Sequence, residues 1–273
     1  MILSGKEVVK SIKTIIKEKL SLLDDIPTLG IYLRNDDEPA RVYSNSIVKK
    51  ASKLGIKAEI IEVPNDIPSQ EFIDLYKKTE VDFDGVIFQR PFPDNIDISL
   101  INNIISPEKD IDSVSSYNLG KIVQNNNVIA PATATAVIDI LEYYNIPLRG
   151  ANVAIIGRSV SVGRPLAMML LQKHATPTVC HTKTKDIPSI TKNSDIVVVS
   201  AGKPGLLNKD YFTKDSVVID VGINVVDGKI VGDVDFDEVS DFVKAITPVP
   251  GGVGTVTTYR LLLNLLEVKS VAK

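Results

Sequence analysis

The feature of this sequence that most constrains its fold is an alternation of short, β-branched apolar runs with longer amphipathic segments. Parallel neighbouring strands need a crossover connection, which is usually a helix, so the alternation predicts mostly parallel sheets. In the first half of the chain it predicts strands over 27–33, 57–63 and 85–91 and helices over about 5–22, 41–54 and 69–79.

A second alternating unit begins at residue 151, after a turn-rich stretch over 106–127 and a helix expected at about 133–144. It predicts strands over 151–157, 176–182, 195–202, 216–222 and 229–234 and helices over 162–174, 187–194 and 255–273. The expected fold is α/β with two domains: an N-terminal α/β substrate domain (1–140) and a Rossmann-type nucleotide-binding domain (141–254). The C-terminal helix (255–273) is expected to return to the first domain.

Composition excludes several classes of protein. The net charge of −3 gives no general attraction to nucleic acid or acidic membranes. The longest apolar runs are strand-sized, far short of the roughly 20 residues that span a bilayer, and the lysine-rich start has no signal-peptide core. Cys180 is the only cysteine and the two histidines lack ligand spacing, so we expect no disulfide and no metal site. We expect a cytoplasmic protein.

The stretch "VAIIGRSVSVGRP" (153–165) runs from an apolar strand through Gly157 into a helix that contains Gly163. Glycine permits a tight turn and a close backbone approach, and N–H groups at the helix start can hold a pyrophosphate. The spacing is G-x-S-x-x-x-G, with Ser159 where a G-x-G-x-x-G motif has its middle glycine. A purely structural strand-to-helix turn is the alternative, which the surrounding βαβ pattern disfavours.

The next strand bears on the choice of cofactor. An NAD site usually has an acidic residue at the end of this strand, which binds the ribose 2′-hydroxyl. Here the strand ends in "HTKT", with no acid before Asp186. Thr182 and its neighbouring lysines suit a 2′-phosphate, and Arg158 could supply a second cation. These residues predict NADP rather than NAD; the alternative is a solvated basic turn.

Several stretches occur together in one order: "VYSNSIVKKASKLGI", "VIFQRPFP", "PEKDID", "GRSVSVGRP", "VIDVGIN", "VGDVDF" and "TPVPGGVG". In this combination the sequence resembles the methylenetetrahydrofolate dehydrogenase/cyclohydrolase family over about residues 1–270. The resemblance implies hydride transfer from 5,10-methylenetetrahydrofolate to NADP, followed by hydrolysis of the methenyl product to 10-formyltetrahydrofolate. It also implies a homodimer formed through the nucleotide domain and a folate-binding catalytic domain at 1–140.

The resemblance also implies residue roles. Tyr43 would pack on the folate rings, Gln89 would orient the catalytic lysine and substrate, and Asp112 would hydrogen-bond the pterin. The structural alternatives are a packed aromatic ring, a polar group at a strand end and a turn former. The implied substrate-loop residues are Pro250, Gly251 and Gly252, and the implied cofactor contacts are Gly157, Arg158, Ser159, Thr182 and Ile223.

One departure concerns the hydrolysis. The family has a lysine four residues after the tyrosine, as the expected general base, and this chain has Ile47 there. Ile47 can neither donate nor accept a proton. Lys50 lies near the same helix face as Tyr43 but about 10 Å further along the axis than Tyr43, so it could take the place of the lysine only in a strained conformation. Ser113, the "PATA" run (131–134) and Thr255 also differ from the family pattern.

The sequence therefore predicts an NADP-dependent methylenetetrahydrofolate dehydrogenase whose cyclohydrolase activity is in doubt. Its partners would be tetrahydrofolate derivatives, with no nucleic acid and no membrane. One alternative is a fully bifunctional enzyme in which water or Lys50 replaces the base. Another, from a different class, is a non-catalytic NADP-binding regulator, which the presence of Tyr43, Gln89 and Asp112 disfavours.

Overall fold

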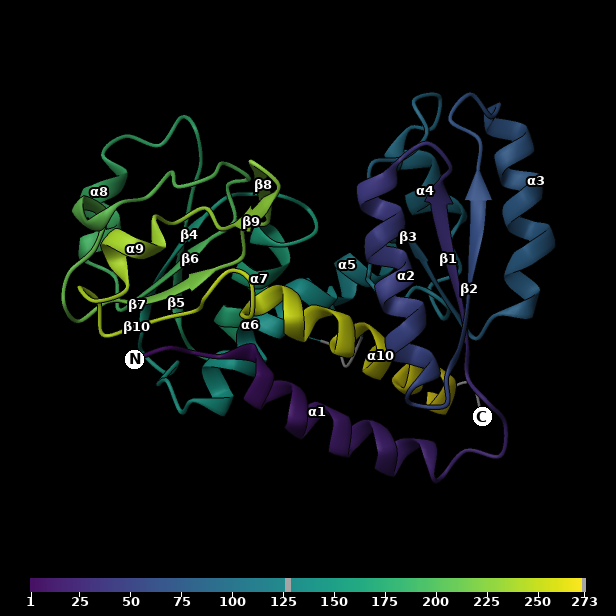
Figure 1. The fold of residues 1–273 in the computed structure, drawn as a ribbon, viewed down its shortest axis with the longest axis horizontal. Coiled ribbons are helices and arrows are strands. Elements are labelled where there is room, and N and C mark those ends of the chain that lie inside the picture. Colours follow the sequence, from purple (N-terminus) through teal and green to yellow (C-terminus); the bar gives the residue numbers. More distant parts are fainter. Residues whose placement is uncertain (126–128, 272–273) are drawn as a thin grey trace. The chain divides into compact units, whose positions relative to one another are not determined.

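The computed structural model describes residues 1–125 and 129–271 and divides into two compact units (Figure 1). Unit 1 consists mainly of Met1–Ile12 and Pro131–Arg260, and unit 2 mainly of Lys13–Lys121 and the chain from Leu261 onward. Helices α1 (Gly5–Leu20) and α10 (Val253–Val271) each contribute residues to both units. The predicted helix over 255–273 extends past the described residues at its last two positions.

Unit 2 contains a parallel sheet in the order β2-β1-β3. Its strands are β1 (Thr28–Arg34), β2 (Lys57–Val63) and β3 (Gly85–Phe88). Helices α2 (Glu38–Ser52) and α3 (Ser69–Thr79) cover opposite faces of this sheet (Figure 1). On the α3 side, the rings of Tyr32 and Phe88 stack with centroids 4.9 Å apart, and Tyr76 packs against both. This aromatic cluster packs α3 against the sheet whose carboxyl edge carries the candidate site residues described below.

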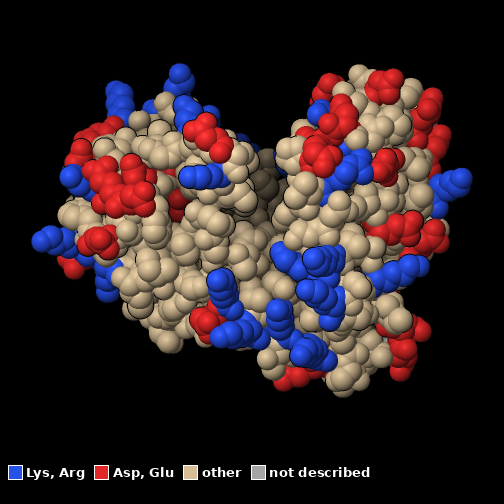
Figure 2. Space-filling model, viewed as in Figure 1, with Lys and Arg blue, Asp and Glu red and all other residues tan. Residues whose placement is uncertain are grey.

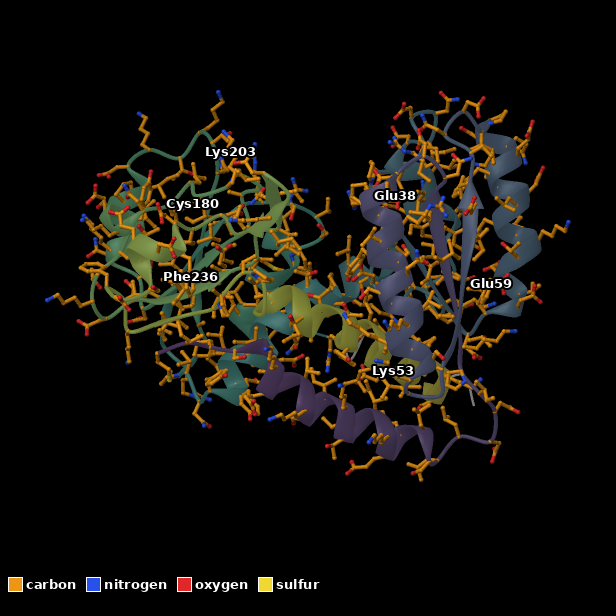
Figure 3. The ribbon with its side chains drawn as sticks, viewed as in Figure 1. Glu38, Lys53, Glu59, Cys180, Lys203 and Phe236 are labelled. Atoms are coloured by element: carbon orange, nitrogen blue, oxygen red, sulfur yellow. The ribbon has the colours of Figure 1, made fainter. Side chains whose placement is uncertain are left out.

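Helix α2 carries clear local signals. The Asp37 side chain accepts the Ala40 backbone N–H at 2.7 Å, which caps the helix start. Glu38 lies in the first turn and lysines lie in the last, as the helix dipole favours; Glu38 and Lys53 mark the two ends in Figure 3. The residues it buries recur at helical spacing: Ala40, Ser44, Ile47 and Ala51.

The stretch over 106–127, which we expected to be turn-rich, is only partly so; its last two residues lie outside the described part. It contains α5 (Ser116–Val123), and α4 (Ile98–Ile104) precedes it. A short 3₁₀ turn, η1 (Glu80–Asp82), leads into β3. The sequence did not predict helix α5, because its few apolar positions directly follow a run of turn-forming residues. Such a run predicts a loop rather than a helix.

Unit 1 contains a five-stranded parallel sheet in the order β10-β7-β6-β4-β5. All residues of β4, β6, β7 and β10 except Asn152 are buried, as expected for strands with both faces covered. The strands are β4 (Asn152–Ile156), β5 (Thr176–Cys180), β6 (Ile196–Val199), β7 (Val217–Asp220) and β10 (Ala245–Ile246).

The helices of unit 1 cover both faces of this sheet (Figure 1). Residues of α8 and α9 pack on the buried cluster that includes Ala154, Val197 and Val218, whereas α7 packs on β4 and β5 and contacts α6. An antiparallel hairpin, β8 (Asn224–Val226) with β9 (Lys229–Val231), follows β7. The remaining elements are α6 (Ala132–Tyr143), α7 (Gly163–Gln172), α8 (Ile187–Lys192), η2 (Lys209–Tyr211) and α9 (Phe236–Val239).

Helix α10 holds parts of unit 2 together. The buried Asn264 side chain donates hydrogen bonds to the carbonyls of Ile111 and Ala130, at 2.8 and 3.1 Å. Near its end, Lys269 forms an ion pair of 2.8 Å with Asp84. Within residues 1–125 and 129–271, no helix is both long enough and apolar enough to cross a bilayer.

Candidate functional site

Tyr43, Gln89 and Asp112 all lie at the carboxyl edge of the unit 2 sheet. Tyr43 is in the second turn of α2, the helix that follows the carboxyl end of β1. Gln89 directly follows β3, and its backbone N–H donates to the Tyr32 carbonyl at 2.9 Å. Asp110 forms a parallel bridge with Val86 of β3, so Asp112 lies two residues further toward the same edge. Ligands of open α/β sheets bind at this edge.

The turn that carries Asp112 is held by a carboxylate that the sequence reasoning did not single out. Asp110 is fully buried and accepts hydrogen bonds from the backbone N–H groups of Val114 and Ser115, at 3.0 and 2.8 Å, and from the Asn118 amide. Burial raises the pKa of Asp110 and these donors lower it, with a net rise. The sequence holds no clear local signal for it, because Asp110 stands between Lys109 and Ile111 in the charged run "PEKDID".

Ser113, a departure from the family pattern, takes a backbone conformation that favours glycine. Its φ is +51°, in the left-handed region that is uncommon for residues other than glycine. The Ser113 hydroxyl donates to the Ile129 carbonyl, which helps to hold the turn. The chain therefore keeps the turn after Asp112 without the glycine.

Arg90 adds a positive charge at the same edge. Desolvation lowers the pKa of its guanidinium, and the charge of Asp112 opposes this shift. The guanidinium carbon also lies 5.2 Å from the centroid of the Phe92 ring, within the range of a cation–π contact. Arg90 stands in the motif "VIFQRPFP", but no role for it follows from the motif alone.

Position 47, where the family has lysine, is fully buried in this chain. Ile47 shares the inward face of α2 with Ala40, Ser44 and Ala51. Lys50 is half-buried, and burial, with a smaller contribution from the charge of Lys13, lowers its pKa. Figure 2 shows basic side chains gathered on the face that includes α2. A lysine with a lowered pKa is a better proton acceptor near neutral pH.

In unit 1 the glycine turn lies at the carboxyl end of β4. Gly157 has a φ of +131°, and a Cβ there would overlap the Ser200 carbonyl. A Cβ on Gly163 would likewise overlap the Gly157 carbonyl, so both positions require glycine. Strand β4 pairs with β5 on one side and β6 on the other, which makes this turn the point where the chain order switches direction. Dinucleotides bind at such points.

The amide groups available in this turn differ from our expectation. The Ser159 hydroxyl accepts from the N–H groups of Val162 and Gly163, at 3.1 and 3.5 Å, and its carbonyl accepts from Arg164. The first amides of α7 are therefore engaged by Ser159 itself. Among the described residues, no backbone or side-chain acceptor binds the amides of residues 158–161, which leaves these donors for an anion.

The residues expected to select the cofactor are exposed at this edge. Arg158 and Thr182 both lie on the surface, the latter two residues after the end of β5. The turn that follows β5 is closed by backbone donors, since His181 N–H binds the Thr184 hydroxyl at 2.9 Å. Ile223 follows β7 with 61% of its surface exposed.

The loop of Pro250, Gly251 and Gly252 leads into α10. The Val249–Pro250 peptide is cis, and Gly251 has a φ of +109°. The Gly251 carbonyl accepts from the Gly5 N–H at 2.8 Å, which ties the loop to the start of α1. A Cβ on Gly252 would lie 2.5 Å from the Pro248 carbonyl oxygen.

The fold and the residues at the carboxyl edges of the two sheets define the class of protein. It is an α/β protein with a Rossmann-type unit, which carries a glycine turn, and a second α/β unit. Comparisons with known proteins then give the family. The model for "Tetrahydrofolate dehydrogenase/cyclohydrolase, catalytic domain" matches residues 3–112. The model for the "NAD(P)-binding domain" of the same family matches residues 131–273. The chain belongs to the tetrahydrofolate dehydrogenase/cyclohydrolase family.

Individual relatives agree with this membership. A protein named "Bifunctional protein FolD" from Dictyoglomus turgidum is 42% identical over 277 residues, with 99% of each chain covered. The crystal structure of the bifunctional FolD from Campylobacter jejuni has a TM-score of 0.95 and 37% identity, covering 100% of this chain and 99% of that one. The Trypanosoma brucei enzyme, solved with NADP cofactor and an inhibitor, has a TM-score of 0.92 and 32% identity, with 100% and 99% covered.

Proposed function

We propose that this protein is an NADP-dependent 5,10-methylenetetrahydrofolate dehydrogenase. The observation that carries the proposal is the match of both family domains, over 3–112 and 131–273, in a chain whose candidate residues lie at the carboxyl edges of its two sheets. The carboxyl edge is where ligands of open α/β sheets bind. The proposed boundary between the two domains stays near residue 140.

NADP fits the residues of unit 1. The glycine positions leave room for a close backbone approach to a phosphate, and the amides of 158–161 are available to it. Arg158 and Thr182 would hold a 2′-phosphate through charge-assisted hydrogen bonds. The end of β5 carries no acidic residue that would repel this phosphate. The related Trypanosoma brucei enzyme was solved with NADP, which supports this choice.

Tetrahydrofolate fits the residues of unit 2. Tyr43 offers an aromatic face to the folate rings, and Asp112 offers two acceptors to the N–H groups of a pterin edge. Asp110 and Asn264 fix the turn around Asp112, so the carboxylate is held before the substrate arrives. Gln89 donates and accepts hydrogen bonds and would orient the substrate.

When bound, NADP supplies the hydride acceptor for oxidation of the methylene carbon. The contribution of the chain is placement: Asp112 and Tyr43 orient the pterin, and the glycine turn with Arg158 orients the nucleotide. Such positioning supplies a large share of the rate enhancement in hydride transfer and needs no side chain to accept a proton. The dehydrogenase reaction therefore tolerates Ile47.

The second reaction to be considered is the hydrolysis of the methenyl product. The relatives carry the name "Bifunctional protein FolD", which supports the bifunctional alternative better than a dehydrogenase alone. Against it stands the buried, apolar Ile47, since loss of general acid–base help typically costs about 10²–10⁴-fold. We propose that hydrolysis is much slower than oxidation, and that any base is Lys50 or a water molecule.

Absorbance-monitored turnover tests the proposal. With 5,10-methylenetetrahydrofolate, kcat/KM should be higher with NADP than with NAD, and methenyl product should accumulate in step with NADPH. A higher kcat/KM with NAD would contradict the cofactor choice. Rapid loss of the methenyl signal would establish the bifunctional alternative, and binding of NADP without turnover would establish a regulator. The homodimer and the cytoplasmic location stay predictions.

A further inference from the structure

Two aspartates of unit 1 are buried at the carboxyl edge of its sheet although none of the proposed roles uses them. Asp220 ends β7 and is 3% exposed, and Asp233 follows β9 and is 0% exposed. A buried carboxylate is costly unless hydrogen-bond donors surround it. Their partners therefore show what the two carboxylates hold in place.

Asp233 gathers the loop that follows β6. Its Oδ2 accepts the backbone N–H groups of Ala201 and Gly202, at 2.6 and 2.9 Å. Its Oδ1 accepts the N–H of Lys203 and the side-chain amide of Asn224, both at 2.9 Å. Figure 3 labels Lys203 in this loop. Four donors thus converge on one carboxylate, a saturated arrangement that fixes the loop and Asn224 together.

Asp220 binds the segments on either side of the hairpin. Its Oδ1 accepts the N–H groups of Gly222 and Asp233, at 2.9 and 3.1 Å, and its Oδ2 accepts that of Val234 at 2.9 Å. Its own N–H donates to the Thr247 hydroxyl at 2.8 Å. Thr247 precedes the loop of Pro250, so the end of β10 is joined to the same network.

Ile223 lies between the two anchored residues. Its predecessor Gly222 is bound to Asp220, and its successor Asn224 is bound to Asp233. A Cβ on Gly222 would overlap the Asp233 carboxyl group, and a Cβ on Gly254 would lie 3.0 Å from the Ile223 Cδ1 atom. The backbone at Ile223 is thus clamped on both sides while its apolar side chain stays exposed.

We infer that Asp220 and Asp233 are positioning residues that fix Ile223 and the 201–203 loop for binding of the dinucleotide. The inference rests on the proposed function, because it assigns the exposed Ile223 side chain to the cofactor. An exposed apolar side chain gains from being covered by a ligand, and a pre-ordered backbone removes the entropy cost of ordering it on binding. Neither aspartate needs to touch the cofactor.

The central variant is Asp233→Asn, which keeps the shape but turns an NH₂ group toward N–H donors. We expect its KM for NADP to rise about tenfold or more, since a loosened site loses pre-organised affinity. Its KM for methylenetetrahydrofolate should stay within about twofold of the wild-type value. A purely structural role would lower the thermal stability without separating the two KM values.

Asn224→Ala is the milder test, because this half-buried residue can be changed without placing an amide among buried donors. It should raise the KM for NADP about threefold through the same loss of order. The matched control is Asp195→Asn. Asp195 accepts the Asn152 N–H at 2.8 Å at the opposite edge of the sheet, so both KM values should stay unchanged in this variant.

Hydrogen–deuterium exchange without ligand separates failure of the inference from failure of the proposed function. The amides of Ala201, Gly202 and Lys203 should exchange faster in Asp233→Asn than in the wild type, whatever the ligand is. Unchanged exchange, or wild-type KM values for NADP in both Asp233→Asn and Asn224→Ala, would overturn the inference. A wild-type protein that does not bind NADP would instead overturn the proposed function and, with it, the role assigned to Ile223.

Discussion

Residue 47 is the position at which the sequence departs from the family pattern for the proposed hydrolysis. The position lies on the fully buried face of α2, so a lysine there would need either a polar channel to the substrate or a lowered pKa. Isoleucine removes this requirement and adds apolar packing against the sheet. The substitution therefore favours the stability of unit 2 and removes a proton acceptor from the site.

Ile47→Lys should raise the rate of methenyltetrahydrofolate hydrolysis, by up to about 10²-fold, if Gln89 can orient the new amine. Because the position is buried, the same change should destabilise the protein by several kcal/mol, roughly the cost of burying an amine. Ile47→Met is the matched control, with similar volume and no charge. Hydrolysis that stays at the wild-type rate in a folded Ile47→Lys variant would place the base elsewhere, and Lys50→Ala would then test Lys50.

Asp220 gives a pH dependence with a definite sign. Burial raises its pKa to about 6, against three backbone N–H groups that lower it, and the charge of Asp233 adds to the rise. The unfolded chain ionises near pH 3.9. The contribution of this group to stability is therefore fully present below about pH 4 and is lost as the pH rises through about 6.

Urea unfolding of the wild type and of Asp220→Asn between about pH 4 and pH 7 measures this loss. The difference in unfolding free energy, wild type minus variant, should fall by on the order of 2 kcal/mol over this range. Asp195→Asn serves as the control, since that carboxylate is exposed. A difference that stays constant with pH would show that Asp220 keeps an ordinary pKa in the folded protein.

At the scale of elements, α10 is anchored to the sheet of unit 2 near its end. Lys269 binds Asp84 at 2.8 Å, and Asp84 also accepts the N–H and hydroxyl of Thr28, at 2.8 and 3.0 Å. Burial alone would raise the pKa of Asp84, but Lys269 and Thr28 outweigh it and lower the pKa. The stability from this contact is thus present above about pH 4 and is lost as the pH falls through the lowered pKa.

Lys269→Met should destabilise the protein by about 1–2 kcal/mol at neutral pH, because it leaves a partly buried carboxylate without its cation. Thermal unfolding at neutral pH and near pH 3 checks this, and the effect should shrink at the lower pH. Lys78→Met, at an exposed position of α3, is the matched control. Equal effects at both pH values would mean that the lysine acts through packing alone.

At the scale of the whole molecule, the pterin-binding candidate and the 2′-phosphate candidate belong to different compact units, although the substrate loop over 250–252 lies in unit 1. Asp112 lies in unit 2 and Arg158 in unit 1. Each unit has its own sheet and core. A change at Asp112 or at Arg158 should therefore weaken the binding of one ligand and leave the binding of the other unchanged.

Thermal shifts test this separation. NADP at about 100 times its Kd should stabilise the wild type by about 2.7 kcal/mol. Asp112→Ala should keep this shift and lose the shift given by a tetrahydrofolate analogue, whereas Arg158→Ala should do the reverse. Loss of both shifts in either folded variant would contradict the assignment of the residue to one ligand.

Much of the fold could be predicted from local pattern. The strands over 57–63 and the helix over 69–79 were expected at their observed bounds, because strong alternation and helical spacing act within a few residues. Strand ends were overextended: the strand expected over 85–91 ends at Phe88, and the chain bends at Arg90 and Pro91, since proline lacks the N–H that strand pairing needs. Helix α5 and strand β8 were missed, because their patterns are short, whereas β9 lies within the strand expected over 229–234.

The sequence by itself determined the α/β class, the glycine turn and the family, because periodicity, glycine spacing and the order of motifs are all written along the chain. Only the tertiary structure decided that Ile47 is buried, that Ser159 takes the first amides of α7, and that Asp110, Asp220 and Asp233 hold the site loops. The most distant hydrogen-bond partner of Asp233 along the chain, Ala201, is 32 residues away. Burial and hydrogen bonding between such distant segments depend on how strands and loops assemble, which no local pattern records.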